Sequence, residues 1–70
     1  MSGYMIIIER EGDDWGAYAP DLPGLGVAGG SREEVERLAN EAIQQHVELL
    51  RELGEVVPIP SAEVAYVGVA

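Results

Sequence analysis

The strongest constraint in this sequence is one long segment, residues 31–54, in which apolar side chains return every three or four positions. That spacing places them along one face of an α-helix. The apolar residues of the segment are Val35, Leu38, Ala39, Ala42, Ile43, Val47, Leu49, Leu50 and Leu53. No other segment is long enough to form a core by itself, so the sequence predicts that the rest of the chain packs on this helix.

Both ends of this helix can be read from the sequence. Ser31 and Glu34 form a capping box, in which the hydroxyl and the carboxylate each accept a hydrogen bond from a backbone N–H of the first turn. Gly54 has no Cβ and so takes at little cost the left-handed conformation that ends many helices. We therefore expect Ser31, Glu34 and Gly54 to be structural residues.

Four segments favour strands, because they are short and rich in β-branched and aromatic residues. They are residues 4–10, 15–19, 25–29 and 63–69. Gly12 lies in a turn between the first two segments and predicts a hairpin. Pro20 and Pro23 have no N–H to donate, so residues 20–24 should form a loop rather than continue the second strand.

These elements predict a single α+β domain over residues 1–70 in the order β-β-β-α-β. The connection through the helix should be right-handed, which would place the fourth strand parallel to the first. We therefore expect one helix packed on a mixed four-stranded sheet with the spatial order 3-2-1-4.

Composition limits the function. Thirteen acidic residues stand against four arginines and no lysine, giving a net charge of −9. Such a surface repels nucleic acid, so we expect no direct nucleic-acid binding by this chain alone. The acidity indicates either a basic partner or only solubility. No membrane-spanning run and no signal peptide are present in the sequence, which predicts a cytoplasmic protein.

A small chain without cysteine has few ways to reinforce its fold, and self-association is the one that the sequence favours. The expected helix is longer than the strands, and one helix cannot cover two apolar sheet faces. The uncovered face, with Trp15 or Tyr18 on it, should meet a second subunit or another partner. We expect a homodimer or a homotetramer.

No enzymatic or cofactor motif is present. The sequence has no nucleophile beside a base and no paired metal-ligand spacing. Gly24 and Gly26 follow a proline turn, so they do not form a dinucleotide-binding loop. Asp13, Asp14 and Asp21 lie in expected turns, where aspartate is common. We predict no catalysis, no metal and no cofactor.

His46 is the one polar residue at the centre of the apolar face of the helix. This position predicts a structural role as a neutral, hydrogen-bonded imidazole in the core. The alternative is a pH-dependent role at a subunit interface.

Several short motifs occur in an order that resembles one family. They are Trp15 to Gly24 with the sequence WGAYAPDLPG, the helix start GSREE at residues 30–34, NEAI at residues 40–43, and Gly54 followed by PIP at residues 58–60. Together they span nearly the whole chain. The chain resembles the HicB family of type II antitoxins.

That resemblance implies a degraded RNase H-like fold and binding to a small basic mRNA-cleaving toxin of the HicA type. Members usually carry a C-terminal DNA-binding domain, whereas this sequence ends at Ala70 without one. We therefore expect a short form of the antitoxin. The alternative is an orphan structural or regulatory oligomer that binds another protein or a small ligand at its subunit interface.

A rigid proline loop beside aromatic residues is suited to holding a partner. The predicted contact residues are Trp15, Tyr18, Pro20, Asp21, Leu22 and Pro23. The alternative is that residues 20–24 form only a tight connection.

We predict that the protein does not cleave RNA or RNA–DNA hybrids. Two-metal hydrolysis needs converging carboxylates, and the middle of the first expected strand carries Ile6, Ile7 and Ile8 instead. Incubation with labelled substrates and Mg²⁺ or Mn²⁺ tests this. Cleavage that disappears when a carboxylate of this chain is mutated would show the prediction to be wrong.

Overall fold

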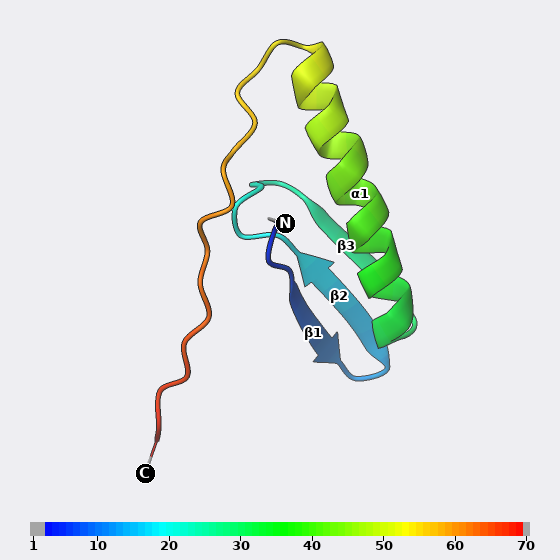
Figure 1. Cartoon of the computed structure of the whole chain (residues 1–70). Coiled ribbons are helices and arrows are strands. Elements are labelled where there is room, and N and C mark those ends of the chain that lie inside the picture. The colour runs from blue at the N-terminus through cyan, green and yellow to red at the C-terminus, as the bar shows by residue number, and fades with distance from the viewer. Residues whose placement is uncertain (1–2, 70) are drawn as a thin grey trace.

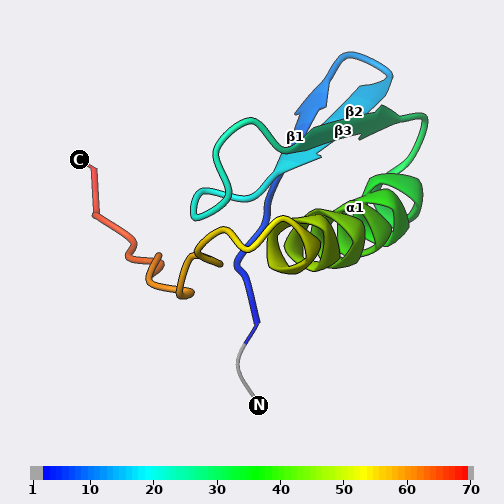
Figure 2. The same ribbon diagram turned by 90° about the horizontal axis from the view of Figure 1, so that it is seen from above.

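The structure, a computed structural model, describes residues 3–69. Its elements are β1 (Ile7–Glu11), β2 (Asp14–Tyr18), β3 (Gly26–Gly29) and α1 (Arg32–Glu52) (Figure 1). The strands form an antiparallel sheet in the order β1-β2-β3, and α1 lies against one face of it (Figure 2). The α+β class and the first four elements are as predicted. The one helix of the described residues is not long and apolar enough to cross a membrane.

The expected fourth strand is wrong for the part of the chain that the structure describes. Residues 63–69 pair with no strand, and the sheet has three strands rather than four in the order 3-2-1-4. The reason is the path after α1. The hydroxyl of Tyr4 donates to the carbonyl of Pro58, and the chain then runs away from the sheet (Figure 1).

The register of the sheet places a small core beneath the helix. Ala17 of β2 lies opposite Ile8 of β1 and Val27 of β3, on the face toward α1. Ala17, Val35 and Ala39 are buried, and Ile6, Ile8, Trp15 and Val27 pack around them. The small Ala17 and Ala39 side chains allow the helix to approach the sheet closely.

The N-terminus of α1 is capped by Ser31, as predicted. The Ser31 hydroxyl accepts a hydrogen bond from the backbone N–H of Glu34 at 3.1 Å. The Glu34 carboxylate does not complete the box in the expected way, because it accepts from the N–H of Gly30 at 3.4 Å. This carboxylate therefore connects the helix to the loop that precedes it.

Gly54, two residues after the last helical residue Glu52, forms the predicted stop after α1. Gly54 has a φ of +71°, and its N–H donates to the carbonyl of Arg51. The next N–H, of Glu55, donates to the carbonyl of Leu50 at 2.9 Å. This pair of bonds satisfies carbonyls that the helix itself leaves free.

Burial decreases along α1, because the helix is longer than the strands. Its 21 residues span about 32 Å, whereas five strand residues span about 17 Å. Leu49 and Leu53, beyond the sheet, are 51% and 62% exposed. His46 is half-buried, so it does not lie in the closed core that we expected. Its structural role stays a prediction.

We predict that Ser31→Ala lowers the free energy of unfolding by about 1 kcal/mol, because the Glu34 N–H loses its acceptor. Urea denaturation followed by circular dichroism measures this. Gln45→Ala, at an exposed position within α1, is the control and should change the value by less than about 0.5 kcal/mol. Equal stability of both variants would contradict the capping role.

Candidate partner-binding site

The loop of residues 20–24 folds tightly on itself. The N–H of Leu22 donates to the carbonyl of Ala19 at 3.0 Å, and the N–H of Leu25 donates to the carbonyl of Leu22 at 3.2 Å. Gly24 has a φ of +85°, which few other residues adopt without strain. These two successive turns give the loop a defined shape.

Leu22 points into the protein rather than toward a partner. Its side chain is 0% exposed, whereas Pro20 and Pro23 on either side are exposed. A residue without exposed surface makes no contact with another protein in this conformation. Leu22 therefore anchors the loop, and the prolines are left as its outer surface.

Asp21 is engaged by its own chain. Its carboxylate accepts hydrogen bonds from the backbone N–H of Ala62 and from the N–H and the hydroxyl of Ser61, each at 3.0 Å. The backbone bond from Ala62, followed by the one from Ser61, lowers the pKa of Asp21 from its ordinary value of 3.8. Asp21 thus joins the loop to a segment some forty residues later.

Trp15 and Tyr18 lie on opposite faces of the sheet. They are three residues apart on β2, and side chains alternate between faces along a strand. Trp15 is half-buried on the helix side, with the guanidinium carbon of Arg10 5.6 Å from its ring centroid. Tyr18 is 44% exposed on the other side. The two aromatic residues cannot form one continuous surface.

The sheet face opposite α1 is uncovered in the described structure (Figure 2). We call it the open face. From the register and the alternation of side chains, it carries Ile7, Glu9, Glu11, Asp14, Gly16, Tyr18, Gly26 and Ala28. Gly16, Gly26 and Ala28 keep its centre flat.

An acidic hollow of about 450 Å³ lies at the hairpin end of this region. Its lining residues are Glu9, Arg10, Glu11, Asp14, Trp15, Gly16 and Ala28. Three carboxylates against one guanidinium give it a negative charge. No group of three or more His, Cys, Asp or Glu residues that could hold a metal ion is found among residues 3–69.

Sequence comparison connects these features to a family. Residues 4–68 match the family described as HicB_like antitoxin of bacterial toxin-antitoxin system. The chain belongs to this family. No curated protein and no solved structure gives a significant match. Membership confirms the resemblance and the non-catalytic class, and it implies an antitoxin role with a toxin as partner.

In this HicB-like antitoxin, the structure separates the six predicted contact residues. Tyr18, Pro20 and Pro23 are exposed, and Trp15 is half-buried. Asp21 accepts hydrogen bonds from the segment after α1, and Leu22 is buried. The acidic hollow was missed. The signal was available, since Glu9 and Glu11 are two apart on one strand and therefore share a face. Partner contact by any of these residues stays a prediction.

We predict that Asp21→Asn frees the C-terminal segment without unfolding the domain. The neutral amide is a weaker acceptor for the three donors of Ser61 and Ala62. Hydrogen exchange at these two amides should become faster, while α1 amides keep their protection. Asp13→Asn, in an exposed turn, is the control.

The same contact should depend on pH. Because the pKa of Asp21 is lowered in the folded protein, its contribution is complete above about pH 3.8 and is lost as the pH falls below that value. The amides of Ser61 and Ala62 should therefore lose protection at acid pH in the wild type. Protection that is independent of both pH and Asp21→Asn would contradict the role assigned to this carboxylate.

Proposed function

We propose that the chain neutralises a small basic mRNA-cleaving toxin of the HicA type by covering the surface with which the toxin contacts RNA. Family membership supports the antitoxin role. The observation that carries the mechanism is the acidic hollow at the hairpin end of the sheet, beside a face that no other element of the described structure covers.

The charges of the two proteins explain the pairing. A toxin that binds RNA must present Lys and Arg side chains to the RNA phosphates. The antitoxin carries a net charge of −9, and Glu9, Glu11 and Asp14 lie close together at the hollow. Opposite potentials of this kind accelerate the encounter and orient the partners. The carboxylates would thus occupy the positions that phosphates take on the active toxin.

Apolar contacts would supply much of the affinity. Tyr18 is the large exposed side chain of the open face, and Ile7 lies directly opposite it on β1. Aromatic anchors on a rigid sheet cost little conformational entropy when they bind. The exposed Pro20 and Pro23 extend the proposed surface, whereas Asp21 and Leu22 support it from within.

We also propose that the protein associates with itself as a homodimer or a homotetramer. Leu49 and Leu53 project from the overhanging end of α1 and remain more than half exposed. Val64 and Tyr66, in the segment after the helix, are 60% and 95% exposed. A chain of this size gains stability by covering such surface with another subunit.

We predict that neutralising the hollow weakens toxin binding. The partner to use is a small basic toxin of the HicA type, purified in a catalytically inactive form. The triple variant Glu9→Gln, Glu11→Gln, Asp14→Asn should bind it at least about tenfold more weakly, mainly through slower association and with a reduced dependence on salt. Surface plasmon resonance at several salt concentrations measures the dissociation constant, the association rate and the salt dependence of binding.

The matched control removes the same number of charges elsewhere. Glu41, Glu52 and Glu55 are exposed and lie outside the hollow, so their triple change to Gln should weaken binding less. Equal effects of the two triple variants would show that only the overall charge matters. Failure of the wild type to form a complex, or to rescue growth when co-expressed with the active toxin, would refute the proposed mechanism.

A further inference from the structure

Residues 63–69 form an extended arm whose side chains contact little of the protein. We call this segment the C-terminal arm. Val64 is 60% exposed, Tyr66 95%, Val67 85% and Val69 93%. Among the described residues, no hydrogen bond joins the arm to the rest of the chain. The arm therefore leaves both its backbone and its apolar side chains without protein partners.

The base of the arm is fixed, unlike the arm itself. The Asp21 carboxylate holds Ser61 and Ala62 through three hydrogen bonds, and the Tyr4 hydroxyl holds Pro58. From this clamp the arm runs away from the sheet (Figures 1 and 2). The radius of gyration is 13.7 Å, compared with about 11 Å for a compact domain of this length. The clamp directs the arm outward.

The composition of the arm is that of a strand. Val64, Val67 and Val69 are β-branched, Tyr66 is aromatic, and Glu63 carries the one charge. Natural edge strands are normally protected by lysine, proline or a covering element. This segment has none of these devices within residues 63–69. An exposed strand of this kind is stable only when another edge pairs with it.

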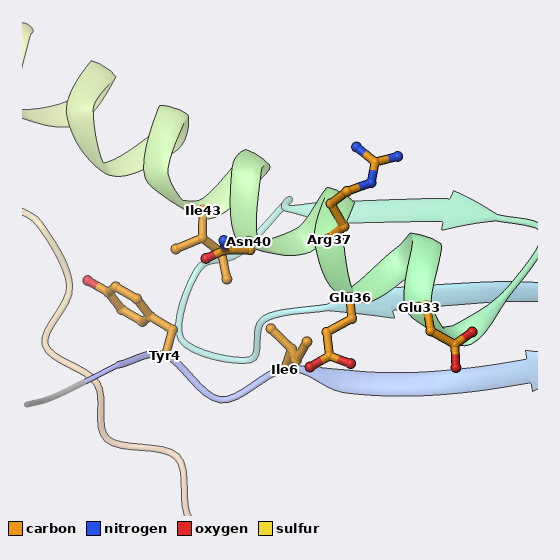
Figure 3. Close-up of a pocket in the computed structure, with 7 residues that line it drawn as sticks. All are labelled: Tyr4, Ile6, Glu33, Glu36, Arg37, Asn40 and Ile43. Atoms are coloured by element: carbon orange, nitrogen blue, oxygen red, sulfur yellow. The ribbon is translucent and has the colours of Figure 1, made fainter.

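A groove between α1 and residues 3–6, directly before the edge strand β1, is suited to receive such a strand. It consists of two adjoining hollows of about 480 and 760 Å³ between α1 and the segment before β1. Its lining includes the apolar side chains of Ile6, Ile43 and Val47 with the ring of Tyr4. The charged residues that line it are Glu33, Glu36, Arg37, Glu48 and Arg51. In Figure 3, Ile6 points toward the helix that carries Ile43, whereas the ring of Tyr4 is directed toward the chain after α1, where its hydroxyl donates to Pro58. β1 is an edge strand of the sheet.

We propose that the C-terminal arm of one copy pairs with the outer edge of β1 in a second copy and places apolar side chains in this groove, while the second arm does the same in return. The proposal rests on the self-association proposed above and names its surface. Strand addition to a sheet edge and reciprocal exchange of a segment are established ways for proteins to associate. Tyr4 lies at both the clamp and the groove, so the two exchanged arms would pass close to each other.

A second copy is a better occupant of the groove than a toxin. Three carboxylates and two guanidiniums line the groove, whereas three carboxylates and one guanidinium line the acidic hollow, so the hollow attracts a basic protein more strongly. Glu63 is the one charged residue of the arm. The nearly uncharged arm also avoids the repulsion that two chains with a net charge of −9 exert on each other. Seven extended residues reach about 23 Å, which is most of the roughly 27 Å of α1 between Glu33 and Arg51 that lines the groove.

The first test compares two charge substitutions at equally exposed valines. Val67→Asp lies in the arm, and Val56→Asp lies outside it with similar exposure. Sedimentation velocity over a range of concentrations gives the dissociation constant of the dimer. Val67→Asp should raise it at least tenfold and Val56→Asp less than about threefold. Circular dichroism should show the same helix content in both variants, because neither residue belongs to the core.

The second test uses the absence of cysteine from the chain. Asn40 lines the groove. When a chain carrying Val67→Cys is mixed with a chain carrying Asn40→Cys, a disulfide should form between the two copies. Tyr66→Cys, adjacent but on the other face of a strand, should react to a different extent. A chain carrying both Val67→Cys and Asn40→Cys that cross-links within itself when dilute would overturn the exchange. A dimer unaffected by Val67→Asp would overturn it in favour of another surface, and a monomeric wild type would refute self-association as well.

Discussion

Val35 and Ala39 of α1 pack against Ala17 at the centre of β2, and this contact holds the helix and the sheet together. Two of these three side chains are alanines, so the contact brings the backbones close but buries little apolar area. Leu22 adds a larger buried side chain from the loop after β2. A core of this size provides limited stability, because a short chain hides a smaller share of its surface than a long one.

The mismatch in length between α1 and the strands follows from the same packing. The helix is covered only where the sheet lies beneath it, so its apolar face continues past the core into half-buried and then exposed positions. The chain after α1 begins beyond the sheet and is held by two separate contacts, at Tyr4 and at Asp21. The loop after β2 therefore has a structural role, because its Asp21 fixes the chain after α1, in addition to any contact with a partner.

Much of this architecture could be predicted from local patterns. The period of the apolar residues predicts α1, and Ser31 and Gly54 mark where it begins and stops. The alternation of side chains along β2 places Trp15 and Tyr18 on opposite faces. The segment 63–69 shows the limit of such patterns. Its β-branched residues favour an extended strand, but nothing in its sequence specifies which edge it meets, because pairing depends on where the preceding segment is fixed. That point is set by Asp21 and Ser61, which are 40 residues apart.

The distribution of charge separates two kinds of contact on one small chain. Glu9, Glu11 and Asp14 gather at the hairpin end, whereas the C-terminal arm carries only Glu63. Electrostatic attraction between exposed groups acts over about 8–10 Å at physiological salt, so in the proposed complex a basic protein would be drawn to the hairpin end rather than to the arm. Two copies of the chain repel each other most strongly where their carboxylates are dense. An apolar arm and the groove beside β1 would let copies meet through surfaces with little net charge, leaving the acidic hollow available to a toxin.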